Sequence, residues 1–343
     1  MARGSAPLTL SRQQILQFRR QAGALDARLP AGARSLRIAA WAGLQDSSPR
    51  AALLSLHARV AGVTSPSWEH QSLVQLWGPR YNDYVVAARD LAVFSLGRLP
   101  EHPRRASRAL DTAARLHEHL AGRRQPFGLA GREMGVPANS LRYAALTGRV
   151  LLRWDGARQP EVWMVAPPTM QPARARLELA RRYLHVFGPT TPAAFTRWAG
   201  IAAKEAHDAF KLLAPELLPV RTPIGDAWTL AEDEAALRAP APPAAPARLL
   251  PSGDTYFLLW GRTRELLVPD ARRWAQLWTS RVWPGALLVH GEVAGTWRRA
   301  GAVVSLDPWR RLSAAEWEAV EGEVASLPLP GPLVAERLPR KGR

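Results

Sequence analysis

The sequence has no cysteine, only three lysines and no apolar run of the roughly 20 residues needed to span a bilayer. Without cysteine the chain forms no disulfide, binds no zinc through thiolates and has no cysteine nucleophile. Residues 1–7 lack the apolar core of a secretory signal. These absences lead us to expect a cytoplasmic protein with no membrane partner.

Acidic residues are also scarce relative to basic ones. Asp and Glu total 29 and Lys and Arg total 46, of which 43 are Arg, and the formal net charge is +17. A G+C-rich genome would explain the preference for Arg over Lys, but not the surplus of positive charge. With 47% apolar residues and 14 tryptophans, the 343-residue chain can bury a core in two or three domains. Because a guanidinium donates two parallel hydrogen bonds to a phosphate, the surplus points to a nucleic-acid partner.

A repeated pattern organises the middle of the chain. Residues 127–168 read as a short helix, a turn at Gly135-Val136-Pro137, a second helix that Asn139 or Ser140 caps, and two strands around Asp155-Gly156. The second helix is expected to end near residue 146, and the strands to cover residues 149–154 and 161–165.

The same pattern returns farther along the chain. Thr191-Pro192 begin a helix that ends near Trp198, Gly200-Ile201 make the turn, and a second helix covers residues 202–213. Two strands are predicted next, over residues 217–221 and 227–230. A helix–turn–helix followed by a two-stranded hairpin is the winged-helix pattern, in which the second helix can enter a DNA major groove.

A third, less regular copy lies near the N-terminus. Trp41-Ala42-Gly43-Leu44 matches Trp198-Ala199-Gly200-Ile201, and a helix is expected from Ser48-Pro49 to about Val60. The hairpin of this copy would consist of residues 73–76 and 84–87.

Residues 239–247 form a proline-rich linker, and short alternating strands follow it. The expected strands are 256–260, 265–268, 286–290, 293–297 and 303–306, with a tight turn at His290-Gly291. A capping box at Ser313 and Glu316 starts a closing helix that ends near residue 325, and a similar box at Ser11 and Gln14 starts the first helix.

We therefore predict an α+β fold with three tandem winged-helix units and a small C-terminal antiparallel β-domain. The predicted winged helices span residues 8–105, 106–172 and 173–238, the linker 239–247 and the β-domain 248–330.

Several segments carry a resemblance to a known family: residues 43–49 (GLQDSSP), 181–184 (RRYL), 187–192 (FGPTTP), 195–200 (FTRWAG) and 291–298 (GEVAGTWR). In them the chain resembles the bacterial winged-helix DNA glycosylases typified by AlkZ and YcaQ, and the resemblance covers nearly the whole chain. It implies three winged helices in a C-shape with a C-terminal β-domain. It also implies a monofunctional enzyme that hydrolyses the N-glycosidic bond of alkylated or crosslinked purines without metal or cofactor.

The family's catalytic motif, Gln-x-Gln or Gln-x-Asp, corresponds here to Gln45-Asp46-Ser47. Ser47 therefore replaces the second catalytic residue of the motif, which is Gln or Asp in the family. The resemblance makes Gln45 the residue that positions water, assisted by Asp46 or Ser47. A second motif, Arg-x-Thr-x-His, reads Arg80-Tyr81-Asn82-Asp83-Tyr84, with Asn82 and Tyr84 in place of Thr and His. Arg80, Asn82 and Tyr84 are thereby implied to lie near the lesion or its phosphate.

The residues themselves are compatible with this chemistry. A purine alkylated at N3 or N7 is cationic and leaves readily, so the protein needs only to orient a water and stabilise positive charge on the sugar. An amide that both donates and accepts can orient the water, and a nearby carboxylate can stabilise the sugar. In the alternative interpretation, Asp46, Ser47 and Ser48 cap a helix and Gln45 is a polar turn residue.

Further DNA contacts are predicted at Arg142, on the second helix of the middle unit, at Arg153, on its hairpin, and at Arg197 and Lys204 in the third unit. We expect a monomer that binds double-stranded DNA in the nucleoid. Two alternatives stay open: a catalytically silent, regulatory winged-helix DNA-binding protein, and a module that binds other proteins.

Overall fold

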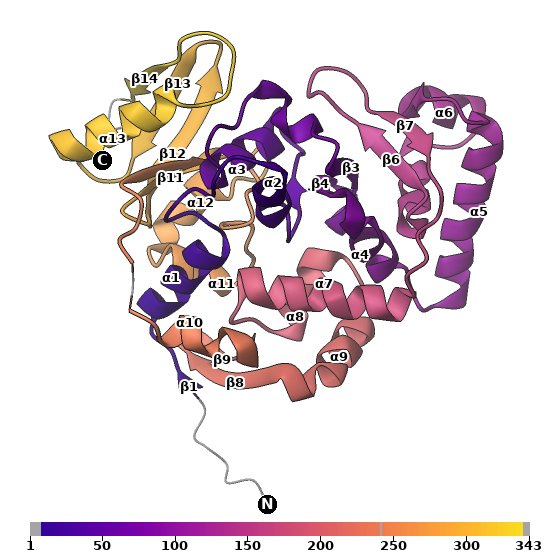
Figure 1. Cartoon of the computed structure of the whole chain (residues 1–343), viewed down its shortest axis with the longest axis horizontal. Coiled ribbons are helices and arrows are strands. Elements are labelled where there is room, and N and C mark those ends of the chain that lie inside the picture. The colour runs from indigo at the N-terminus through magenta and orange to yellow at the C-terminus, as the bar shows by residue number, and fades with distance from the viewer. Residues whose placement is uncertain (1–7, 241, 339–343) are drawn as a thin grey trace, which may run out of the picture.

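The computed structural model describes residues 8–240 and 242–338 (Figure 1). Helices alternate with the strands of three sheets, which confirms the predicted mixed α+β class. No helix in this described part is both long and apolar enough to cross a membrane.

A six-stranded antiparallel sheet joins two hairpins that are separate in sequence. Its strands, in spatial order, are β2 (Leu44–Gln45), β4 (Asp83–Ala87), β3 (Leu73–Trp77), β6 (Val150–Arg153), β7 (Glu161–Met164) and β5 (Gln125–Pro126). Strands β3 and β6 meet where Gln75 lies opposite Leu152, so the N-terminal hairpin continues into that of the middle segment. Strand β2 is an edge strand, and it carries Gln45.

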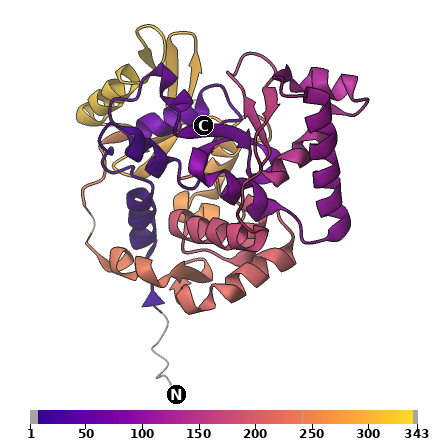
Figure 2. The same cartoon turned by 45° about the vertical axis from the view of Figure 1, so that its right-hand side comes forward.

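Helices flank this sheet. In chain order they are α2 (Ala33–Ala39), α3 (Ala51–Arg59), α4 (Leu91–Ser95), α5 (Pro103–Leu120) and α6 (Phe127–Glu133). Helix α5 lies along the outer edge of the molecule in Figures 1 and 2. It buries a stripe at helical spacing (Ala109, Ala113, Leu116 and Leu120), which packs mainly on residues 138–147. The predicted second helix of the middle unit is a 3₁₀ helix over Ala138–Thr147, and neither Asn139 nor Ser140 caps it because it begins directly after Pro137.

The third repeat agrees closely with its prediction. Helix α8 (Pro192–Ala199) starts with the Thr191 side chain accepting from Ala194 N, and Gly200 ends it in a left-handed conformation. Helix α9 (Ala203–Leu212) and the hairpin of β8 (Leu217–Thr222) and β9 (Gly225–Leu230) follow. Strand β1 (Leu8–Thr9) adds to β8 in parallel, and α10 (Glu234–Arg238) packs on α1 (Arg12–Ala22), whose capping box is present as predicted.

The C-terminal segment forms a five-stranded sheet of β10 (Ala247–Leu250), β11 (Gly285–Val289), β12 (Glu292–Ala300), β13 (Val303–Pro308) and β14 (Val334–Arg337). It is antiparallel except for the parallel pair of β13 and β14, so the fully antiparallel prediction is wrong at that edge. Helix α13 (Ala314–Ala325) starts with the capping box of Ser313 and Glu316, as predicted.

Two predicted strands of this segment are wrong. Residues 256–257 form a turn and residues 258–260 have no regular secondary structure. Residues 265–268 fall largely in helix α11 (Thr263–Leu267), with helix α12 (Trp274–Leu277) beyond. Phe257, Leu258 and Leu259 are all buried in the main core, whereas an alternating strand would bury every second side chain. A short apolar run does not show whether a segment forms a strand, a helix or an irregular loop, because all three can bury its side chains.

The central helix α7 (Pro172–Phe187) supplies the main core. Its Tyr183 ring stacks on Phe187 at 4.7 Å and on Trp198 at 5.0 Å between centroids. Arg19 of α1 is buried and donates to the carbonyls of Phe187 and Gly188 at the C-terminus of α7, at 2.7 and 3.0 Å. A cation at the negative end of the helix dipole is favourable, so α1 both packs on and caps α7.

Other buried guanidinium groups also join distant segments. Arg98 donates to the carbonyls of Trp77 and Ala199 at 3.1 and 3.0 Å, which connects β3 with α8. Burial lowers its pKa to about 10, so it keeps its charge at neutral pH. Arg182 of α7 bonds to Asp90 at 2.8 Å.

The Arg59–Asp254 pair connects α3 with the turn that follows β10. Its two N–O contacts are both 2.7 Å, and the side chains are 2% and 0% exposed. Asp254 also accepts from Ser55 Oγ and from the backbone N–H of Tyr256, so each of its two carboxylate oxygens accepts two hydrogen bonds. The turn 251–256 is therefore fixed to α3.

We predict that Arg59→Met lowers the free energy of unfolding by about 3–5 kcal/mol, because it leaves Asp254 buried without its partner. Urea denaturation measures the change. Lys204→Met, which removes the exposed pair with Asp208, should have no measurable effect. Equal destabilisation by both variants would contradict the role assigned to the buried pair.

Candidate functional site

Gln45 lies on the edge strand β2, opposite Tyr84 of β4, rather than in the predicted turn. Its side chain is half-buried, and its Oε1 accepts a long hydrogen bond of 3.5 Å from the Tyr84 hydroxyl. On the other side, its amide packs against Gly253, where a Cβ would lie 3.0 Å from Gln45 Nε2. Gly253 has a φ of +76°, which glycine adopts without strain. The amide is therefore held between a hydroxyl and a loop backbone.

Asp46 turns inward and is 4% exposed. Its Oδ1 accepts from Ala52 N in the first turn of α3 at 2.8 Å, and its Oδ2 accepts from Gln75 Nε2 at 2.6 Å. Gln75 in turn accepts from the backbone N–H of Trp154 at 2.6 Å. Burial raises the pKa of Asp46 to about 7, although both donated hydrogen bonds favour the carboxylate. Asp46 thus caps the N-terminus of α3, as the alternative interpretation of the sequence predicted.

Ser47, the next residue, is exposed, and the helix that follows begins at Ala51 rather than at Ser48-Pro49. The motif therefore divides into three environments. Gln45 is partly accessible on the sheet edge, Asp46 is buried beneath it, and Ser47 faces solvent.

Arg80 lies at the tip of the β3–β4 hairpin in a left-handed conformation, with φ 56°, and Tyr81 follows with φ 59°. Arg80 Nη1 donates to the carbonyl of Arg197 on α8 at 3.2 Å, and its guanidinium lies 5.8 Å from the Trp260 ring centroid. A left-handed residue other than glycine is unfavourable, so the contacts from α8 and the Trp260 turn hold this tip in place. Asn82, which ends the tip, is partly exposed.

The prediction that Tyr84 contacts DNA directly is wrong because its side chain is enclosed, whereas Arg142 is only partly enclosed. Tyr84 is 1% exposed, and burial raises the pKa of its hydroxyl above its usual range, so it stays protonated and serves as a donor toward Gln45. Arg142 is partly buried, with its guanidinium 5.7 Å from the Trp77 ring centroid and Nη1 donating to the Tyr81 carbonyl at 3.0 Å. Its charge supports the hairpin tip from inside.

The remaining predicted cations are exposed and lie on three elements. Arg197 is on α8, beside Arg80. Arg153 ends β6 and pairs with Glu69 at 2.7 Å, and Lys204 on α9 pairs with Asp208 at 2.6 Å. Exposed pairs of this kind contribute little to stability, so both cations are free to exchange their partners for a phosphate.

Sequence reasoning missed residues that the fold brings to this region. Trp260 and Arg262 line a cleft of about 390 Å³ that Arg197 also borders. Gly253 and Gln75 contact the motif residues Gln45 and Asp46 directly. Ordinary turn glycines and strand glutamines carry no signal of this kind in a single sequence.

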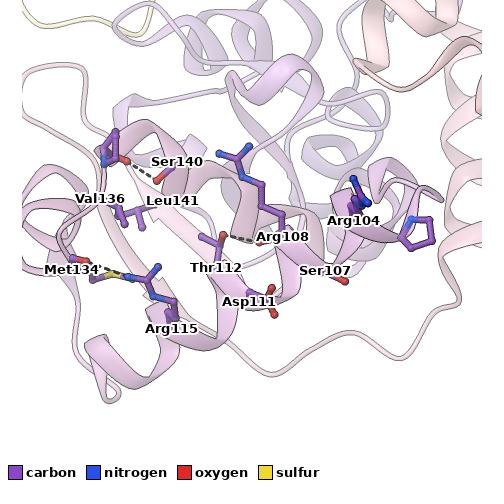
Figure 3. A pocket seen from close by; sticks show the side chains of 12 residues that line it. Arg104, Ser107, Arg108, Asp111, Thr112, Arg115, Met134, Val136, Ser140 and Leu141 are labelled. Atoms are coloured by element: carbon purple, nitrogen blue, oxygen red, sulfur yellow. Dashed lines mark hydrogen bonds between the residues drawn. The ribbon is translucent and has the colours of Figure 1, made fainter.

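A second groove runs between α5 and residues 134–141, which comprise a turn and the start of the 3₁₀ helix (Figure 3). Arg104, Arg108 and Arg115 of α5 line it, and Arg115 donates to the Met134 carbonyl at 3.2 Å. With a volume of about 670 Å³ it is open and carries several cations. None of the predicted motif residues lines it.

The chain matches the family model described as DNA glycosylase AlkZ-like over residues 38–328. No curated protein matches it in sequence. Its structure is similar to that of the DNA glycosylase AlkZ of Streptomyces sahachiroi, with a TM-score of 0.77 and 19% sequence identity, over 96% of this chain and 100% of that one.

The matched segment includes both motifs, at residues 45–47 and 80–84, and the whole six-stranded sheet, whereas β1 and β14 of the other two sheets lie outside it. The likeness in structure extends over nearly the whole chain. The resemblance inferred from the sequence is therefore confirmed: this protein belongs to the AlkZ-like family of DNA glycosylases.

Proposed function

We propose that this protein is a monofunctional DNA glycosylase that hydrolyses the N-glycosidic bond of alkylated or crosslinked purines in duplex DNA. The observation that carries the proposal is the fixed, partly accessible amide of Gln45 on the edge strand, between the Tyr84 hydroxyl and Gly253. Membership of a family of DNA glycosylases supports the same role in DNA repair.

Gln45 would orient the attacking water. A carbonyl oxygen has two acceptor positions, and Tyr84 uses one of those on Oε1, which leaves the other for a water O–H. The water oxygen then bonds to C1′ of the deoxyribose as the bond from C1′ to the purine nitrogen breaks. The bonding pair neutralises the cationic purine, and the proton of the water passes to solvent. Holding the water in line with C1′ is the main contribution required of the protein.

Asp46 acts in this proposal as a positioning residue. Its carboxylate accepts a hydrogen bond from the start of α3 and another from Gln75, which in turn accepts from Trp154 N. Because Asp46 directly follows Gln45, these hydrogen bonds fix the end of the strand that carries Gln45. Ser47 is the exposed member of the motif and would contact the sugar or its phosphate.

The finer features of the fold and of DNA binding belong to the same proposal. Three tandem winged helices in a C-shape, with the predicted boundaries, would cradle a duplex, and α8, α9 and the β8–β9 hairpin supply one such unit. Arg80, Asn82, Arg153, Arg197 and Lys204 would contact phosphates or the lesion. The protein would act as a monomer on chromosomal DNA in the nucleoid.

We predict that Gln45→Ala lowers the rate of base release by about 10²-fold or more, because the water is no longer held in line. The assay incubates the protein with duplex DNA carrying N7-methylguanine and cleaves abasic sites with alkali. If the wild-type protein binds this DNA tightly without producing strand breaks, it is instead a catalytically silent DNA-binding protein. The serine at position 47, which departs from the family motif, would agree with that result.

Gly253→Ala should lower the same rate by about 10²-fold, since the added Cβ would displace the Gln45 amide. The matched control is Gly301→Ala, which introduces a similar left-handed strain, at φ +60° rather than +76°, into open space. Both variants should lose similar stability, but only Gly253→Ala should lose activity. Equal activity in the two variants would remove Gly253 from the site.

The rate of base release should rise with pH, with a midpoint near 7. The pKa of Asp46 is raised to about 7, and only its ionised form accepts from both Ala52 N and Gln75. Its ionised fraction grows as pH increases through that value, so activity grows with it. In Asp46→Asn this step should disappear, because the amide does not ionise in this range. A pH–rate profile unchanged by the substitution would contradict the role of Asp46.

A further inference from the structure

A large cleft lies beside the hairpin tip, and Trp260 does not line it. Its volume is about 870 Å³, within the range of ligand-binding clefts. Its lining comes from Tyr81 at the tip, residues 98–102, helix α5, the 138–147 helix with Tyr143, and residues 200–205 around the start of α9. None of the motif residues Gln45, Asp46 and Ser47 lines it.

Two tyrosine rings meet in this cleft. Tyr81 and Tyr143 pack edge to face, with 5.4 Å between centroids and 76° between planes. Both side chains are partly exposed. Tyr81 is one of the two left-handed residues of the hairpin tip, and Arg142 holds its backbone carbonyl in place. Strain of this kind is typical of functional segments.

Arginines surround the two rings. The guanidinium of Arg108 lies 4.0 Å from the Tyr143 ring centroid, and that of Arg98 lies 5.1 Å from the Tyr81 centroid. Arg105, one helical turn before Arg108, is exposed and lines the same cleft. Burial raises the pKa of the Tyr81 hydroxyl, while the positive charges of Arg98, Arg108 and Arg105 act in the opposite direction.

The carboxylates of the cleft are already engaged. Glu205 is 5% exposed and accepts from the backbone N–H groups of Glu101 and Ala202, at 2.8 and 3.0 Å. Glu101 pairs with Arg176. The unengaged charge that faces the cleft is therefore positive, and it comes mainly from Arg105 and Arg108.

Aromatic rings interleaved with arginines are the chemistry that binds unpaired nucleotides. A base within a duplex is stacked on its neighbours and cannot reach a ring inside a cleft, whereas an unpaired base can stack there while arginines hold its phosphates. A damaged or mismatched base pair opens at least cost, so unpaired nucleotides are available beside a lesion.

We propose that the cleft lined by Tyr81, Tyr143, Arg105 and Arg108 binds an unpaired nucleotide of the DNA strand next to the site of base release. This inference rests on the proposed function, since it assumes that DNA is the substrate. The hairpin tip would then contact DNA through Arg80, near Trp260, and through Tyr81, at the unpaired base.

The test compares two undamaged, fluorescein-labelled DNAs, a duplex and the same duplex with a two-nucleotide bulge, by fluorescence anisotropy at fixed salt. Wild-type protein should bind the bulged DNA about tenfold more tightly, because stacking one base contributes a factor of this order. Arg105→Gln should remove most of that preference.

Arg104→Gln is the matched control. Arg104 is the adjacent, exposed residue of α5 with the same charge, but it lines the other groove, seen in Figure 3. Both variants should weaken duplex binding to a similar extent, and only Arg105→Gln should reduce the preference for the bulge. Equal loss of that preference in both variants, or its absence in wild type, would overturn the inference.

A second measurement reports stacking directly. 2-Aminopurine placed in the bulge should lose fluorescence on binding wild-type protein or Tyr143→Phe, and should keep it with Tyr143→Leu. Quenching by all three proteins would exclude the tyrosine from the binding site. Failure to bind either DNA would overturn the proposed function itself, whereas binding to both DNAs with equal affinity would overturn only this inference.

Discussion

Guanidinium groups buried between distant segments hold this molecule in one arrangement. Arg19 caps the central helix α7 from α1, Arg98 connects β3 with α8, and Arg59 fixes the turn of residues 251–256 to α3. Arginine suits these positions because its planar group satisfies several carbonyl or carboxylate oxygens at once and keeps its charge when buried. Each connection joins segments that are far apart in the chain, so the relative placement of the segments depends on them.

This use of arginine changes what the basic composition means. The surplus of positive charge pointed to a polyanionic partner, and family membership agrees with that interpretation. Yet Arg142, predicted to contact DNA, lies against Trp77 and supports the hairpin tip from inside. The exposed positive charge therefore comes from side chains such as Arg80 and Arg197, and not from every arginine in the total count.

The candidate site depends on the same long-range placement. Gln45 lies between Tyr84, which precedes α7 in the chain, and Gly253, which follows the proline-rich linker. The Arg59–Asp254 pair positions the turn containing Gly253, so a buried ion pair on one side of that turn helps to align a glutamine amide on the other. Asp46 adds a connection to Gln75 and Trp154. The water-positioning role proposed for Gln45 needs this rigidity, because small displacements are costly to catalysis.

The sequence by itself determined what depends on local chemistry. The caps at Ser11, Thr191 and Ser313, the hairpin of β8 and β9, and the motif that led to the family all depend on residues close together in the chain. Only the tertiary structure decided whether the apolar run of residues 257–259 became a strand or a buried irregular segment. It also decided that Tyr84 was buried and Arg142 partly enclosed, and that Gly253 would reach Gln45. Burial and long-range contact depend on which distant segment packs against a residue, and local periodicity carries no record of that partner.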